Sequence, residues 1–216
     1  MSHPQPIPQL PFIHLTNGAR LHASNLRLTG RGILLEQGFS AAVVPGEIYY
    51  ITAPNGAGKS SVLACLAGLL HPDSGTVEIR QENHPLSTTK KSALISWLPP
   101  EDDFVIPQSA IDIVLAGRWR FHLGRPSQQD RKIALQCLEM LEVETIFNKN
   151  STTLSSGQKR RVNLARVIAQ DAAIILLDEP FRGLDVQARR LCQRAFVALK
   201  SLGRTIIIAD PNPPLE

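Results

Sequence analysis

Residues 53–61, Ala-Pro-Asn-Gly-Ala-Gly-Lys-Ser-Ser, have the residue types and spacing of a phosphate-binding loop. The apolar, β-prone segment 48–51 precedes them, and the apolar segment 62–70, which has the composition of a helix, follows. A strand, a glycine-bearing turn and a helix in this order gather the backbone N–H groups and the positive dipole end of a helix N-terminus. We therefore predict that this turn binds the phosphates of a nucleotide rather than merely starting a helix.

The residues of this loop have distinct chemical tasks. Gly56 and Gly58 let the backbone close around an anion without a Cβ in the way. Lys59 would reach the β- and γ-phosphates, and the Ser60 hydroxyl would hold Mg²⁺. Ala53 stands where the motif has its first glycine, and its methyl group costs roughly 1 kcal/mol if φ there is positive. The candidate nucleotide ligands are Asn55, Gly56, Ala57, Gly58, Lys59, Ser60 and Ser61.

Two adjacent carboxylates follow a second apolar run. Residues 173–177 have the length and composition of a strand buried on both faces of a parallel sheet, and Asp178 and Glu179 come directly after them. Neighbouring side chains at a strand end point in different directions, so one can bind Mg²⁺ while the other polarises a water. We predict that Asp178 is the second metal ligand and Glu179 the catalytic general base; the alternative is a strand that ends in surface acids.

A third motif, Leu-Ser-Ser-Gly-Gln at 154–158, precedes a helix with a basic face. A Ser-Ser-Gly turn is by itself only a capping signal, but it also presents a helix N-terminus that can seat an anion. Ser155, Gly157 and Gln158 are therefore further candidate nucleotide ligands.

The composition is that of a globular protein. The 216 residues are 43% hydrophobic and carry a formal net charge of +4 without a basic stripe interleaved with aromatics, so no nucleic-acid partner is expected. Three widely spaced cysteines indicate a reducing compartment. The Pro-rich N-terminus has no apolar signal region, and we expect a cytoplasmic protein.

The order of predicted elements is α/β with a helical insertion after Pro99. Residues 1–22 are expected to form a Pro-rich arm in which His14 and His22 are solvated, and Ser127 with Asp130 resembles a capping box. Cys137 is expected to pack in the core. We predict strands over 21–28, 33–44, 48–51, 76–80, 93–98, 173–177 and 205–209, helices over 62–70, 111–119, 130–141, 159–170 and 186–200, a turn at 29–32 and a loop over 81–92.

With these three motifs in this order, residues 25–212 resemble the nucleotide-binding subunit of an ABC transporter. Residues 53–61 resemble its Walker A motif, 154–158 its signature, 174–179 its Walker B motif and 181–185 its D-loop. The resemblance implies a P-loop NTPase (RecA-like) core with an antiparallel β subdomain and a helical insertion at about 101–169, all within one domain at 23–216.

The family's mechanism is implied as well. ATP and Mg²⁺ would bind at a head-to-tail dimer interface, where the signature helix of one subunit points at the γ-phosphate in the other. The implied partners are a second ATPase subunit, identical or different, transmembrane permease subunits and, through the permease, a solute-binding protein. The chain would lie at the inner face of the cell membrane.

Two segments indicate a subfamily. Residues 103–118 and 123–131 are similar to importers of metals and metal chelates, which carry manganese, zinc, iron-siderophores, haem or cobalamin. Residues 154–161 and 181–185 are also similar to the haem-exporter ATPase of cytochrome c biogenesis.

The chain departs from the family at three places. Pro100 stands where the Q-loop glutamine is expected, and Pro211 stands at the position of the switch histidine. No aromatic residue for adenine stacking occurs at 29–31, although the Arg31 guanidinium could stack. We therefore expect binding of Mg-ATP with slow hydrolysis at the chain's own site. The alternatives are a regulatory subunit that barely hydrolyses and a non-transport ABC protein acting on ribosomes or DNA.

Overall fold

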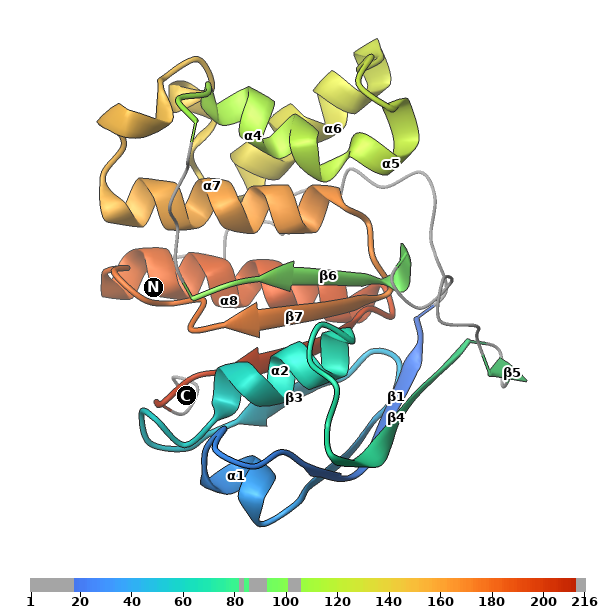
Figure 1. Ribbon diagram of the computed structural model, residues 1–216. Helices are drawn as coiled ribbons and strands as arrows, with labels where there is room; N and C mark the ends of the chain where they lie inside the picture. Colours follow the sequence, from blue (N-terminus) through green and yellow to red (C-terminus); the bar gives the residue numbers. More distant parts are fainter. Residues whose placement is uncertain (1–17, 82–83, 86–92, 101–105, 213–216) are drawn as a thin grey trace, which may run out of the picture. The chain divides into compact units, whose positions relative to one another are not determined.

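The computed structural model describes residues 18–81, 84–85, 93–100 and 106–212 (Figure 1). These residues form two compact units. One is helical and consists of residues 106–170 with Gly183–Leu199; the other contains both sheets and consists of the described residues up to 100, Asp171–Arg182 and residues 200–212.

The first sheet of the second unit is parallel, with the strand order β3-β8-β7-β6. Its strands are β3 (Ile48–Ile51), β8 (Thr205–Ala209), β7 (Ile174–Asp178) and β6 (Ile95–Leu98). Every residue of β7 and β8 is buried, as expected for central strands of a parallel sheet. Helix α2 (Lys59–Ala67) packs against β7 and β8. The carboxyl ends of β3, β7 and β8 lie at one edge, which is where the candidate motifs occur.

The second sheet is antiparallel, with the order β2-β1-β4-β5. It consists of β1 (Arg20–Arg27), β2 (Phe39–Val43), β4 (Ser74–Gln81) and β5 (His84–Pro85). Strand β1 alternates buried and exposed residues over its first half, so one face packs on the core and the other faces solvent.

The expectation of one strand over 33–44 is wrong in its first part. Residues Ile33–Glu36 form the short helix α1, which places Leu35 in the core. Gly32 and Gly38, on either side of it, have φ of +98° and +94°, values at which the chain cannot continue as an ordinary strand. Gly38 therefore separates the apolar residues 33–35 from β2, which begins at Phe39.

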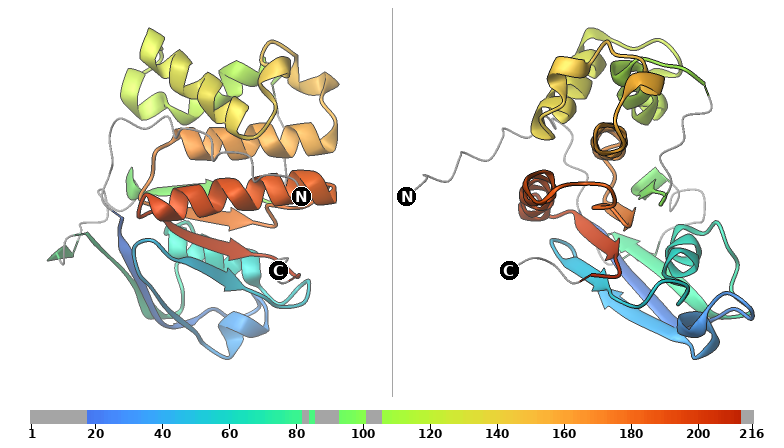
Figure 2. Two further views of the ribbon diagram at one scale, coloured as in Figure 1. Left: turned by 180° about the vertical axis from the view of Figure 1, so that it is seen from behind. Right: turned by 90° about the vertical axis from the view of Figure 1, so that its left-hand side faces the viewer.

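The helical unit is held together by three packed helices. These are α4 (Ala110–Gly117), α6 (Gln128–Met140) and α7 (Ser156–Ala169), each in contact with the other two. The predicted capping box at Ser127 and Asp130 is confirmed. The remaining elements of the unit are α5 (Trp119–His122), two 3₁₀ turns at Glu144–Ile146 and Ser151–Thr153, and most of α8 (Val186–Ser201); Figure 2 gives two further views.

Most predicted boundaries lie within two residues of the observed ones, but α2 begins and ends three residues earlier than predicted and α7 begins three residues earlier. Residues 93–94, predicted to begin a strand, are helical. Strand β1 reaches into the segment expected to be an N-terminal arm, where His22 is exposed; His14 and residues 1–17 lie outside the described residues. The expected loop at 81–92 includes the last residue of β4 and both residues of β5. Its other residues lie outside the described ranges. Cys65, Cys137 and Cys192 are all buried thiols. Within the described ranges, no helix is long and apolar enough to cross a bilayer.

Candidate nucleotide-binding site

The loop between β3 and α2 has the backbone shape that its glycines predict. Gly56 has φ of +80°, and Gly58, the N-cap of α2, has φ of +93° and ψ of +17°. Left-handed conformations of this kind are open to glycine at no steric cost. Ala53 does not have a positive φ, so the cost considered for its methyl group does not apply.

A second glycine turn packs directly against this loop. A Cβ on Gly58 would lie 2.3 Å from the Arg31 carbonyl oxygen, and one on Gly32 would lie 2.6 Å from the Gly58 nitrogen. The Leu34 N–H donates to the Ala57 carbonyl at 3.1 Å. Residues 30–32 and 56–58 are therefore two backbone walls that only glycine allows to come so close.

Lys59 is held within the loop from which it projects. Its ammonium Nζ donates to the carbonyl oxygens of Ala53 at 2.7 Å and Pro54 at 3.0 Å, and the residue is 5% exposed. An ammonium has three N–H donors, so these two bonds orient the side chain and leave one donor for a phosphate oxygen.

The two carboxylates sit at the end of β7. Asp178, its last residue, is 1% exposed. Glu179 has φ of +45°, and its N–H donates to the Ala209 carbonyl of β8 at 2.8 Å. A left-handed residue turns the chain sharply, which sends the two side chains in different directions and costs of order 1–3 kcal/mol. Strain of this kind is common at functional sites.

A pocket of about 390 Å³ joins these parts, within the size range of small-molecule sites. It brings Glu179 together with six of the seven predicted loop residues; the seventh, Ala57, is buried beneath the loop. Ser60 lines the pocket, whereas Asp178, the other predicted metal ligand, is buried and is not among its lining residues. A hydroxyl and a carboxylate are the types of oxygen ligand that Mg²⁺ prefers, so the chemistry of these two groups fits that ion. The pocket is lined by Gly30, Arg31, Gly32, Asn55, Gly56, Gly58, Lys59, Ser60, Ser61 and Glu179.

Sequence reasoning missed two of these lining residues. Gly30 and Gly32 lie in a Gly-Arg-Gly stretch that predicted only a turn between strands. The available signal was the pair of glycines on either side of a cation, because small residues around an arginine allow a close approach to an anion. Arg31, proposed as a stacking partner for adenine, does line the pocket.

The remaining candidate ligands lie in the helical unit, at the start of α7. The Ser155 hydroxyl accepts from the Gln158 N–H at 3.2 Å, and the Gln158 side-chain oxygen accepts from the Ser155 N–H at 3.1 Å. This is a complete capping box, so both side chains order their own helix terminus. A Cβ on Gly157 would lie 3.2 Å from the Gly183 carbonyl, so Gly157 is a point of close approach to Gly183 within the helical unit.

The two prolines lie near the ends of the strands that precede them. Pro100 comes two residues after β6, and Pro211 comes two residues after β8. Between β8 and Pro211, Asp210 is 4% exposed; its N–H donates to the Ile51 carbonyl at 3.3 Å, and its carboxylate accepts from the Asn212 N–H at 2.9 Å. Residues 210–212 thus form a turn closed by an aspartate side chain.

A strand, a glycine loop that ends in Gly-Lys-Ser, a helix and a second buried strand that ends in Asp-Glu, with the glutamate in the same pocket as the loop, define a P-loop NTPase. The sequence profile of the ABC transporter family matches residues 37–182, about two-thirds of the chain. This chain belongs to the ABC transporter family, and the matched region is that family's ATP-binding domain.

The chain is similar to several ATP-binding proteins of known systems. It is 34% identical over 174 residues to the manganese transport system ATP-binding protein MntA of Synechocystis sp., covering 79% of this chain and 66% of that protein. It is 35% identical over 196 residues to the cytochrome c biogenesis ATP-binding export protein CcmA of Idiomarina loihiensis, covering 90% and 87%. The chain therefore spans just under two-thirds of the manganese-transport relative.

Solved structures agree with the fold. One that was assigned to the metal-chelate type of ABC transporter, in an inward-facing conformation, has a TM-score of 0.75 at 27% identity, covering 91% of this chain and 74% of that one. CbiO1 from Clostridium perfringens, part of the ABC transporter complex CbiONQ, has a TM-score of 0.71 at 25% identity, covering 89% and 78%. The predicted class, an α/β P-loop NTPase with an antiparallel β subdomain, is confirmed.

Proposed function

We propose that this chain is the ATP-binding and ATP-hydrolysing subunit of an ABC transporter, acting on a transmembrane permease. The observation that carries the proposal is the pocket in which Lys59, Ser60 and Glu179 meet. A loop amine, a hydroxyl and a general base around one cavity are what the binding and hydrolysis of a nucleoside triphosphate need.

The role of each residue follows from its position. The N–H groups of Gly56 and residues 58–61 and the Lys59 ammonium hold the phosphate oxygens, whereas the Ala57 N–H donates to the Pro54 carbonyl at 3.2 Å. Ser60 and Asp178 would hold Mg²⁺, which neutralises phosphate charge when it is bound. Glu179 polarises the attacking water. The hydrogen bond from its N–H to the Ala209 carbonyl fixes the backbone from which this side chain extends into the pocket.

The helical unit would complete a second subunit's site. The capped N-terminus of α7 presents unpaired backbone N–H groups and a positive dipole end, which stabilise a γ-phosphate in a partner's pocket. Two copies of this chain, or this chain and a related subunit, would close head to tail on ATP and separate after hydrolysis.

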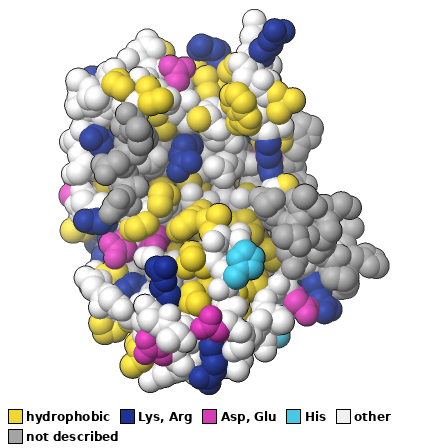
Figure 3. All heavy atoms as spheres, viewed as in Figure 1, with side chains coloured by type: hydrophobic (Ala, Val, Ile, Leu, Met, Phe, Trp, Pro, Cys, Tyr) yellow, Lys and Arg dark blue, Asp and Glu magenta, His cyan; other side chains and the backbone are white. Residues whose placement is uncertain are grey.

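We expect this cycle to take place at the inner face of the cell membrane, with permease subunits and a solute-binding protein as further partners and no nucleic acid. On the face seen in Figure 3, the described basic side chains are interspersed with acidic and hydrophobic ones.

The cargo we propose is a metal ion or metal chelate moving inward. The similarity to a manganese transport ATP-binding protein and to a metal-chelate type transporter supports this choice. Haem export is the second candidate, because the likeness to the cytochrome c biogenesis protein covers more of both chains. Co-purification with a polytopic membrane protein, followed by identification of that protein, separates the two.

Hydrolysis at the chain's own site is expected to be slow. Pro100 and Pro211 offer no side-chain hydrogen bond to water, Mg²⁺ or the γ-phosphate, and an ionised carboxylate at Asp210, next to Pro211, would repel that phosphate. A weakly hydrolysing regulatory subunit is the limiting case of this proposal.

A single-turnover assay with radiolabelled Mg-ATP tests both the proposed ATP binding and the proposed slow hydrolysis. Lys59→Ala should lose most of the ATP binding that the unmodified chain has. Pro100→Gln/Pro211→His should raise the single-turnover rate at least tenfold, which corresponds to about 1.4 kcal/mol in the barrier. No nucleotide binding by the intact chain, alone or with a partner subunit, would overturn the proposed function. Brisk turnover by the unmodified chain that is lost in Glu179→Gln would overturn only the slow-site part.

A further inference from the structure

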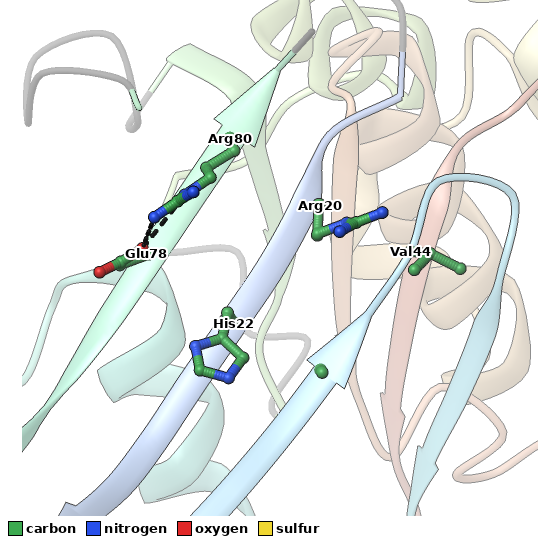
Figure 4. Close-up of a pocket in the computed structure, with 6 residues that line it drawn as sticks. Arg20, His22, Val44, Glu78 and Arg80 are labelled. Atoms are coloured by element: carbon green, nitrogen blue, oxygen red, sulfur yellow. Dashed lines mark hydrogen bonds and ion pairs between the residues drawn. The ribbon is translucent and has the colours of Figure 1, made fainter. Parts of the chain in front are cut away.

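The outer face of the antiparallel sheet carries a second pocket, of about 360 Å³, which the nucleotide site does not use. Three adjacent strands contribute to it through alternate residues, so its lining side chains point away from the core (Figure 4). It is lined by Arg20, His22, Ala42, Val44, Glu78 and Arg80.

The strand register places like charges opposite each other. Arg20 of β1 is the direct cross-strand partner of Arg80 of β4, and His22 is the partner of Glu78 on one side and of Ala42 on the other. Like charges directly opposite in an antiparallel pair are unfavourable. In Figure 4 the two side chains extend to opposite sides, Arg20 toward Val44 and Arg80 toward Glu78, and a bound anion would draw both guanidinium groups toward itself.

The side chains of Arg20 and Arg80 differ in their hydrogen-bond and ion-pair partners. Arg80 donates from Nη2 to Glu78 at 2.7 Å and from Nε at 3.2 Å, in an ion pair whose side chains are each about half exposed. Exposed pairs of this kind are weak, so an anionic ligand can compete with Glu78. The Arg20 guanidinium makes no hydrogen bond or ion pair with any residue in the described ranges, and Figure 4 shows it extending from β1 toward Val44.

The pocket also has an apolar side. Ala42 is small and leaves room beside His22, and Val44, the residue after β2, is 43% exposed. Planar guanidinium forks bind phosphate oxygens in pairs, an imidazole can add a further contact, and an apolar wall can hold the carbon part of an ester.

We propose that this pocket binds a phosphate group, separately from the nucleotide-binding site. Arg20 and Arg80 turn toward the phosphate and hold its oxygens from two strands, His22 contacts it from the position two residues along β1, and Glu78 limits its affinity by competing for Arg80. The phosphate can belong to a soluble ester or to the headgroup of an anionic lipid, and these share one recognition chemistry.

The test follows the ring signals of His22 by nuclear magnetic resonance while inorganic phosphate is added at constant ionic strength, with sodium chloride as the reference salt. The signal is assigned by its loss in His22→Gln. A saturable shift is expected, and it should persist in Lys59→Ala, in which phosphate binding at the nucleotide site is weakened. Arg20→Gln/Arg80→Gln should weaken the apparent affinity at least tenfold, and Glu78→Gln should tighten it two- to threefold. Arg194→Gln is the matched control, because its side chain is 52% exposed, like the 51% of Arg80.

Vesicle sedimentation distinguishes the two sources. Binding to vesicles of phosphatidylglycerol and phosphatidylcholine, absent with phosphatidylcholine alone and lost in the double arginine variant, assigns the phosphate to a lipid headgroup. A His22 response without vesicle binding assigns it to a soluble ester. No His22 shift with phosphate, or the same shift in the double arginine variant, would overturn the proposal and leave the proposed ATP site untouched.

Discussion

Alanine substitutions at Gly58 and Gly56 should have very different consequences, although both residues belong to the same loop. Each has a positive φ, so each alanine carries a left-handed conformation that costs roughly 1–2 kcal/mol. At Gly56 the added methyl group meets nothing within 4 Å. At Gly58 it would lie 2.3 Å from the Arg31 carbonyl, about 1.1 Å short of the 3.4 Å at which ordinary contact begins.

Backbone cannot rotate away as a side chain can, so the two walls of the pocket must separate in Gly58→Ala. Overpacking of this kind adds roughly 1–3 kcal/mol, which gives a total near 2–5 kcal/mol against 1–2 kcal/mol for Gly56→Ala. For a chain of this length, each kcal/mol lowers the melting temperature by roughly 2–4 °C. The affinity for Mg-ATP should also fall further in Gly58→Ala, because residues 30–32 line the pocket.

The assay is thermal unfolding followed by circular dichroism without nucleotide, then calorimetric titration of both variants with Mg-ATP. The first measurement isolates the backbone clash, since neither glycine then has a phosphate to contact. Equal melting temperatures for the two variants would refute the close approach of residues 30–32 to the loop, and with it the shape of the pocket.

Three further predictions concern other parts of the chain. Glu179→Gln should retain Mg-ATP affinity within about threefold and lose measurable single-turnover hydrolysis, because the amide cannot accept a proton; loss of binding instead would show that Glu179 serves the fold. Arg204→Met leaves the buried carboxylate of Asp171, its ion-pair partner, without compensation and should cost about 3–5 kcal/mol in urea unfolding, partly restored in Asp171→Asn/Arg204→Met. Burial raises the pKa of Cys192 to about 12, so only about one thiol in 10⁴ is ionised at pH 8 and alkylation detected by mass spectrometry should require unfolding; rapid labelling of Cys192 in the native chain would contradict this.

The sequence predicts best where one local signal decides the structure. The short, β-branched apolar run 173–177 favours a buried strand over a helix, and β7 is buried at every position. The serine at 127 with aspartate three residues later predicts a capping box, and the structure has both of its hydrogen bonds. These features depend on residues adjacent in the chain, so no tertiary information is needed.

The sequence predicts less well where two distant segments share one function. Residues 30–32 form a wall of the pocket only because Gly32 and Gly58 allow backbone contact across 26 positions of sequence. Nothing in the local pattern of 29–36 shows that contact, so the apolar residues 33–35 favoured a strand over the observed helix α1. The same limit applies to Arg20 and Arg80, whose pairing is set by strand register alone.

The turn after β8 decides whether the proposed slow site can be repaired. The Asn212 N–H is bonded to the Asp210 carboxylate, and the Asp210 N–H to the Ile51 carbonyl, so the path of this turn is fixed by groups other than the side chain of Pro211. A histidine at 211 can therefore be introduced without removing the bonds that hold the turn, although it restores a flexible φ at a small entropic cost. Because Glu179 is bonded to Ala209, the residue before Asp210, the general base and the restored side chain would extend from one rigid strand end. Any gain from Pro211→His should consequently vanish in Glu179→Gln/Pro211→His, and a gain that survives the second change would mean that the added histidine acts by itself.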